Sequence, residues 1–174
     1  MAVIEAIATQ YLEAPAQSVT FSGIPSTYEH LQLRMSVTEE YSAATRSYAE
    51  VFLNGSTDQI FSYHIMTGMT STAGVVTGTP TSGAIRAVSG GNQATAGYAG
   101  TVLDILDYAN TNKNTTILYT SGWGPLNANG TVALGSLLWD DTAAISSIKI
   151  ADSPWSAIDF QRGSSFTLYG LKSA

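Results

Sequence analysis

The stretch that decides the fold is Ser18-Val-Thr-Phe-Ser-Gly-Ile-Pro-Ser-Thr-Tyr-Glu-His-Leu-Gln-Leu-Arg-Met-Ser-Val37. Its second half alternates strictly between polar residues and the apolar Leu31, Leu33, Met35 and Val37. Strict alternation is the pattern of a β-strand with one face in the core and the other in water or in contact with a neighbour. Pro25 predicts a turn before this strand, because proline has a fixed φ and no amide hydrogen to donate. We therefore expect a strand at 17–22, a turn, and a strand at 30–38.

The other end of the chain carries a matching strand-like segment, Gly163-Ser-Ser-Phe-Thr-Leu-Tyr-Gly-Leu-Lys172. Further segments of period two lie between these ends, separated by turns rich in Gly, Ser, Thr and Asn. They fall at 3–12, 46–53, 59–67, 84–89, 97–108, 115–121 and 131–139, and around Ile145, Ile148 and Ile150. Little helix is expected. The pattern predicts an all-β fold over residues 1–174, a single antiparallel β-sandwich of about ten strands that is jelly-roll-like.

The stretch from Gly68 to Gly83 gives the weakest signal, because it is rich in Gly, Ser and Thr and contains Pro80. It fits either a long loop or an edge hairpin around Val75 and Val76. By contrast, Asn54-Gly55 is a strong signal for a tight turn, since both residues tolerate positive φ.

The composition favours a protein that works in an assembly. Charged residues make up 11% of the 174 residues, against about 25% in ordinary soluble domains. A surface poor in charge and rich in hydroxyl groups fits one that neighbouring molecules cover. The net charge is −6, and the seven Lys and Arg are scattered, whereas binding to a phosphate backbone needs clustered cations. We therefore expect no nucleic-acid partner.

Several other classes of protein also lack support. The chain has no cysteine, which excludes disulfides and thiolate chemistry. Residues 1–8 contain Glu5 and no cation, so they do not resemble a signal peptide. No apolar run approaches the roughly 18 residues of a membrane span. We expect no membrane partner.

No motif for catalysis or for a cofactor is present. His30 and His64, the two histidines, lie at strand positions without a nucleophile elbow or a zinc-binding spacing. Asp104 and Asp107 have odd spacing, so they point to opposite faces of a strand and make a poor glycosidase pair. The acidic turns at Glu39-Glu40 and Asp140-Asp141 lack the residue order of a calcium loop, and we expect them to be solvated. We expect no enzyme activity, no cofactor and no metal.

Aromatic residues in predicted loops leave two alternatives open. Tyr41, Trp123 and Trp155 could form a sugar-stacking platform, as in carbohydrate-binding β-sandwiches. Aromatic residues at turn junctions also plug the ends of a sandwich or pack in an interface. We favour packing or an interface.

The segment Thr20-Phe-Ser-Gly-Ile-Pro-Ser-Thr-Tyr-Glu-His-Leu-Gln-Leu33 resembles a recurrent opening of small phage virion proteins. The closing Gly163–Lys172 segment looks like the end of the same family, and Trp139-Asp-Asp-Thr-Ala-Ala-Ile-Ser-Ser-Ile-Lys-Ile150 looks like the strand-turn-strand before it. These segments cover about a quarter of the chain, and residues 40–135 depart from the pattern.

The resemblance implies a structural protein of a tailed phage. Such sandwiches serve as capsid decoration (cement) proteins, often trimeric, or as head fibres and tail-fibre tips. We expect a non-enzymatic decoration protein on the outer capsid surface, with itself as a homotrimer and the major capsid protein as partners. The alternative is a receptor-binding fibre module on the tail or head that binds a host glycan. The residues expected to form the contact surface are Tyr41, Val75, Val76, Trp123 and Trp155, with the rest of the 68–83 segment.

Overall fold

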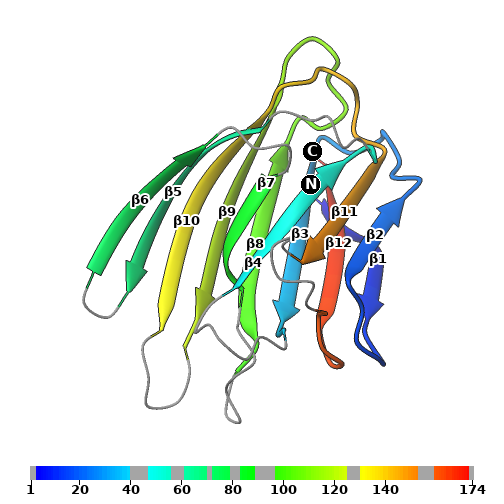
Figure 1. Cartoon of the computed structure of the whole chain (residues 1–174). Helices are drawn as coiled ribbons and strands as arrows, with labels where there is room; N and C mark the ends of the chain where they lie inside the picture. Colours follow the sequence, from blue (N-terminus) through cyan, green and yellow to red (C-terminus); the bar gives the residue numbers. More distant parts are fainter. Residues whose placement is uncertain are drawn as a thin grey trace.

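A computed structural model describes residues 3–39, 47–55, 61–69, 72–78, 83–88, 97–124, 130–152 and 159–172. These residues form twelve β-strands (Figure 1). The strands are β1 (Val3–Tyr11), β2 (Ser18–Ser22), β3 (His30–Val37), β4 (Ser47–Leu53), β5 (Phe61–Met69), β6 (Thr72–Gly78), β7 (Gly83–Val88), β8 (Ala99–Leu106), β9 (Thr115–Trp123), β10 (Thr131–Trp139), β11 (Ser147–Asp152) and β12 (Ser165–Lys172). The all-β prediction is confirmed.

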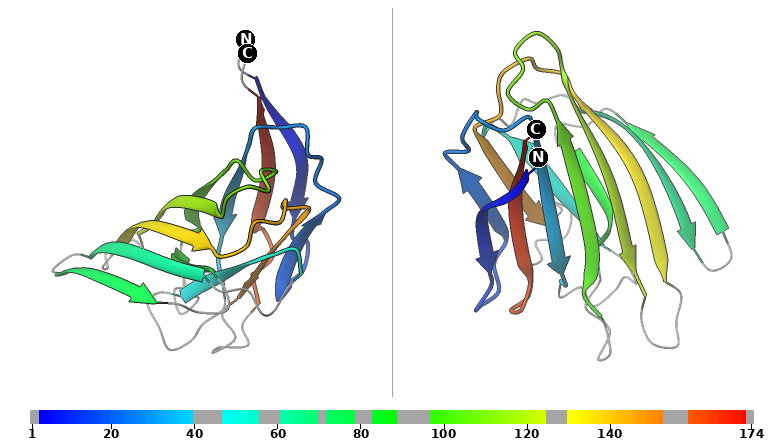
Figure 2. Two further views of the ribbon diagram at one scale, coloured as in Figure 1. Left: turned by 90° about the horizontal axis from the view of Figure 1, so that it is seen from above. Right: turned by 180° about the vertical axis from the view of Figure 1, so that it is seen from behind.

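The strands form two antiparallel sheets that pack as a sandwich. The large sheet has eight strands in the order β1-β12-β3-β8-β9-β10-β5-β6, and the small sheet has four in the order β2-β11-β4-β7. Strand β7 of the small sheet packs against β9, β10 and β5 of the large one. Strand β6 forms one edge of the large sheet. The small sheet covers the part of the large sheet that lies away from β6 (Figures 1 and 2).

The strand pairs are nested, and this nesting is the jelly-roll pattern. Strand β5 pairs with β6, β4 with β7, β3 with β8, β2 with β11, and β1 with β12. Successive pairs alternate between the large and the small sheet. The chain therefore folds like one long hairpin wrapped into two layers. A hairpin, β9–β10, is inserted on the return path between β8 and β11 and widens the large sheet.

Alternating apolar side chains from both sheets form the core. The four residues that the sequence assigned to the inner face of β3 are all buried. The largest fully buried side chains are aromatic, and Phe160 meets Phe166 edge to face with ring centroids 5.2 Å apart. This geometry suits the quadrupoles of aromatic rings. The rings of Trp139, Tyr108 and Tyr119 are also among the largest fully buried side chains.

The two end segments contact each other directly. Tyr28 lies over Gly170, where an added Cβ would come within 2.3 Å of the ring. The ammonium of Lys172 lies 4.7 Å from the centroid of the same ring, and the Tyr28 hydroxyl donates to Glu5 over 3.0 Å. This hydrogen bond raises the pKa of Tyr28 and keeps the phenol protonated. We call Glu5, Tyr28, Gly170 and Lys172 the terminal clasp.

Asn54-Gly55 forms the tight turn that the sequence predicts. The φ angles are +54° and +68°, as a type I′ turn requires at its two central residues. The Asn54 side chain also fixes the segment before β11: its amide donates to the Ala144 carbonyl at 2.9 Å, and its oxygen accepts from the Ser146 amide at 2.8 Å. This second role has no signature in the sequence.

Four features differ from the sequence-based description. Asp107, expected on one face of a strand at 97–108, lies in the turn after β8 at a φ of +50°. The 68–83 segment contains strand β6, so the hairpin alternative is right and the loop alternative is wrong. Trp123 is the last residue of β9 and is 5% exposed, so its placement in a loop is wrong. Glu39, expected in a solvated acidic turn, is fully buried and its backbone pairs with that of Phe160. In each case packing against distant parts of the chain decides the conformation, and local sequence patterns carry no information about that packing.

The packing of Tyr119 leaves no room for a side chain at Gly135 of β10. A Cβ on Gly135 would lie 2.1 Å from the ring of Tyr119, its buried neighbour on β9. We expect Gly135→Ala to lower the free energy of unfolding by about 1–3 kcal/mol through overpacking. Urea unfolding measures this loss.

Gly122→Ala is the matched control, because a Cβ there meets no atom within 4 Å. Since alanine is favoured over glycine inside a strand by about 0.5–1 kcal/mol, this variant should be neutral or slightly stabilised. Equal losses in the two variants would contradict the packing described for Tyr119.

Candidate functional site

The outer face of the large sheet is divided into a polar half and an uncharged half. Strands β9, β10, β5 and β6 lie side by side, and none contains Asp, Glu, Lys or Arg. Large apolar side chains point outward from these four strands. Those with the highest exposure are Val75 at 68%, Met66 and Val132 at 61% each, and Leu134 at 53%. Leu118 and Leu138 are exposed on the same face. We call these six residues the uncharged face.

The strand register places these side chains in lateral rows. Leu134 of β10 is opposite Met66 of β5, and Met66 is opposite Val75 of β6. One row further along, Val132 is opposite Gly68. Side chains directly opposite in an antiparallel pair have Cβ atoms about 4.5–5.5 Å apart. The apolar groups are therefore continuous across three strands.

The uncharged face is slightly hollowed at this point. A shallow depression of about 400 Å³ opens between β10, β5 and β6. It is lined by Met66, Thr67, Gly68, Ala73, Gly74, Val75, Val132 and Leu134. Its lining is almost entirely apolar, so the depression suits an apolar side chain of a partner and offers little to orient a polar substrate.

The polar half of the same face satisfies its own hydrogen bonds. On β3 and β8, the Gln32 amide donates to Asp104 at 2.7 Å, and Arg34 donates to the Gln32 oxygen at 2.8 Å. The Arg34 guanidinium also lies over the ring of Tyr169 on β12, 4.9 Å from its centroid. These contacts occupy the charged groups, so the polar half is a solvated surface beside the uncharged face.

The predicted contact residues have different positions. Val75 belongs to the uncharged face, and Val76 follows it in β6, where the structure describes only its backbone. Trp123 is buried at the end of β9 and offers little surface to a partner. Tyr41 and Trp155 lie outside the described residues.

The sequence analysis missed the centre of the uncharged face, formed by Met66, Val132 and Leu134. A signal for it exists, because residues 59–85 and 114–139 form two long runs without a single charged residue. Only the strand order shows that these two runs are neighbours in space.

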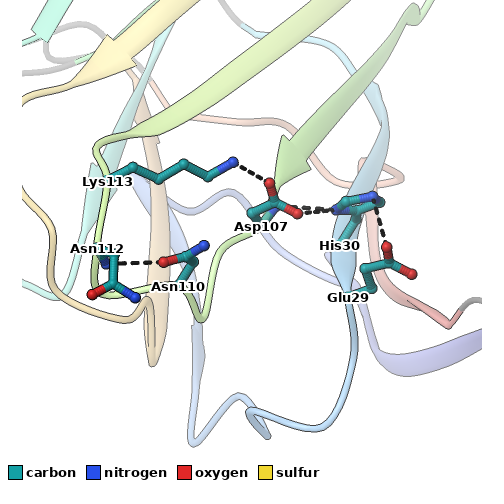
Figure 3. A network of polar contacts seen from close by, with 6 residues as sticks. All are labelled: Glu29, His30, Asp107, Asn110, Asn112 and Lys113. Carbon is teal, nitrogen blue, oxygen red and sulfur yellow. Dashed lines mark hydrogen bonds and ion pairs between the residues drawn. The ribbon is translucent and has the colours of Figure 1, made fainter.

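A second cluster surrounds His30, where β3 begins and β8 ends (Figure 3). The Asp107 amide donates to His30 Nδ1 at 3.0 Å, and one Asp107 carboxylate oxygen lies 3.3 Å from that nitrogen. His30 Nε2 lies 3.9 Å from a Glu29 oxygen. Asp107, at a φ of +50°, also forms an ion pair with Lys113. Both ring nitrogens thus face an amide or a carboxylate, so the cluster ties the β8–β9 turn to β3.

His64 occupies a different position, exposed on β5 beside the uncharged face. In the ranges that the structure describes, no three His, Cys, Asp or Glu residues are grouped as metal ligands. Nor do those ranges contain a helix long and apolar enough to cross a membrane.

Comparison with protein-family models, with curated protein sequences and with solved structures found no significant match to this chain.

The Asp107–Lys113 ion pair makes stability depend on pH. The hydrogen bond from Lys113 lowers the pKa of Asp107 in the folded protein. A lowered pKa stabilises the fold above the ordinary value of 3.8, and this contribution is lost as the pH falls through the folded value. Because both side chains are partly exposed, we expect Lys113→Met to lower the melting temperature by only about 1–3 °C at neutral pH.

The difference between wild type and Lys113→Met should disappear in strong acid, where Asp107 is protonated. Melting curves by circular dichroism from about pH 7 to pH 2 measure it. Lys149→Met serves as the control, since Lys149 lies over the Phe52 ring and its effect should not follow the titration of Asp107. A Lys113→Met difference that persists unchanged at the lowest pH would contradict the ion-pair assignment.

Proposed function

We propose that this chain is a non-enzymatic structural protein of a tailed-phage virion and that it decorates the outer surface of the capsid. The observation that carries the proposal is the uncharged face. Three neighbouring strands of an eight-stranded sheet, β10, β5 and β6, present contiguous apolar side chains, and neither these strands nor β9 contain Asp, Glu, Lys or Arg. Exposed apolar patches of this kind mark surfaces that bind another protein.

The end segments support the virion setting. They resemble the opening and the end of small phage virion proteins, and the terminal clasp joins them through Tyr28 and Gly170. Because β1 pairs with β12 and the Tyr28 hydroxyl bonds to Glu5 of β1, the first strand is tied to the sheet edge and resists fraying. A protein that reinforces a pressurised shell benefits from this resistance.

The proposed mechanism is non-covalent adhesion. The uncharged face packs on the major capsid protein, and copies arranged as homotrimers share the load. Stable interfaces bury about 1,600 Å² in total, so the depression at Met66 and Leu134 serves as the centre of a larger contact. Acidic residues outside the uncharged face, among them Glu13, Asp140 and Asp141, face basic patches of the capsid and steer the approach.

The position in the particle tests the proposal directly. We expect cryo-electron microscopy of particles that carry this chain to place it on the outer capsid surface in many symmetry-related copies. Finding it only on the tail would overturn capsid decoration. Binding to a glycan panel would instead support the receptor-binding alternative, whose candidate aromatic residues Tyr41 and Trp155 lie outside the described residues.

A variant pair tests whether the uncharged face makes the contact. Leu134→Lys places a charge at the centre of the face and should reduce binding to undecorated capsids by at least tenfold, since burying an unpaired ammonium is unfavourable. Thr9→Lys is the control on the polar half, where the Thr9 hydroxyl is exposed and bonds to Thr167. Co-sedimentation with capsids measures both, and equal binding by the two variants would exclude the uncharged face as the contact.

A further inference from the structure

Among the residues that the structure describes, strand β6 has a paired neighbour on one side only, so it is an open edge of the large sheet. It pairs with β5 on one side over seven residues, Thr72–Gly78, with an uninterrupted register. Its sequence, Thr-Ala-Gly-Val-Val-Thr-Gly, contains no charge and no proline. Free sheet edges carry unsatisfied backbone groups and pair with other strands unless something blocks them. Neither of the usual sequence-encoded blocks, a charge or a proline, is present here.

The other three sheet edges carry such blocks. Strand β1 contains Glu5, and its register shifts at a bulge between Ala6 and Ala8. Strand β7 contains Arg86, and the pairing of β4 with β7 shifts as well. Strand β2 has only five residues, and the Gln10 side chain donates to its Thr20 carbonyl at 2.8 Å. Charges, bulges and short length are the devices by which proteins protect edges. Strand β6 differs from all three.

The net charge of the chain indicates that a second copy is the molecule that pairs with β6. The chain has a net charge of −6, so two copies repel each other unless they meet through a neutral surface. Strand β6 and its neighbours β5, β10 and β9 form such a surface. A second copy would approach through strands that contain no acid.

We propose that β6 pairs antiparallel with β6 of a second copy, about a two-fold axis at Val75. This register sets Val75 opposite the partner's Val75 and Ala73 opposite the partner's Thr77, all exposed side chains of the outer face. The apolar row from Leu134 through Met66 to Val75 then continues into the second copy. Backbone hydrogen bonds supply affinity, and the side-chain pairs fix the register.

The pairing is isologous, because the same strand is used by both copies. It is a separate contact from the three-fold one that the family resemblance implies: the two-fold pairing forms between free copies in solution, and the three-fold contact forms on the capsid. It also stands independently of capsid binding, since it concerns the edge of the sheet and requires no other protein.

The mass of the purified chain in solution is the first test. We expect sedimentation equilibrium to give a dimer of about 37 kDa, twice the 18.3 kDa of the chain. A monomer at concentrations of about 100 μM, or a closed trimer, overturns the proposal.

Two variants distinguish dimer formation through the β6 edge from dimer formation through the uncharged face. Val75→Lys puts two ammonium groups opposite each other at the axis and should weaken the dimer at least tenfold. Val132→Lys is the control: it is nearly as exposed on the same face but lies on β10, two strands from the edge. It should remain dimeric. If both variants become monomers, the copies meet through the face and the edge pairing is wrong; if both remain dimers, it is wrong as well.

Cross-linking keeps the test independent of how a lysine affects folding. The chain has no cysteine, so Val75→Cys introduces a single thiol. Directly opposite strand residues have Cα atoms about 4.5–5.5 Å apart, within the range of a disulfide. We expect Val75→Cys to form a covalent dimer on mild oxidation and Val132→Cys to remain monomeric on a non-reducing gel. The reverse result, or equal cross-linking of both, overturns the two-fold register.

Discussion

The position of β12 between β1 and β3 holds the sandwich together. In the part of the chain that the structure describes, β12 is the only strand paired with β1 and one of two paired with β3, so β12 connects β1 to the rest of the large sheet. Phe166 and Leu168 of β12 are buried in the core, and the terminal clasp fastens its end through Tyr28. Removing β12 would leave β1 without a strand to pair with and open the core on one side.

The nested pairing also explains why one surface can be uncharged. The inserted β9–β10 hairpin carries the large sheet beyond the small one, together with β5 and β6. Inner faces of β9 and β10 contact β7 and are buried, while their outer faces keep large apolar residues. Strands β5, β9 and β10 bury side chains on one side only. The residues on the outer side of these strands are therefore not needed for the core and can contact a partner.

Local patterns predicted the elements that depend on local rules. The alternation from Leu31 to Val37 gave the strand and its buried face, and Asn54-Gly55 gave the turn, because both follow from backbone geometry. The strand order could not be predicted, since pairings such as β1 with β12 join residues from opposite ends of the chain. Trp123 was misplaced because its flanking glycines suggested a loop, whereas pairing with Thr131 extends β9 through it. Predicting the uncharged face requires both the uncharged runs in the sequence and the strand order. Of its six residues, the sequence analysis named only Val75 as a contact residue.

The nesting sets an order of events during synthesis. Val3 pairs with Lys172, so β1 leaves the ribosome long before its partner does. At about 5–20 residues per second, the delay is on the order of ten seconds. Throughout that time β1 and one side of β3 are unpaired edges. The inner pairs β5–β6 and β4–β7 can already form. Newly made chains are therefore most exposed to mispairing at β1, where Glu5 and the bulge discourage it, and β1 gains its paired strand only when β12 has been made.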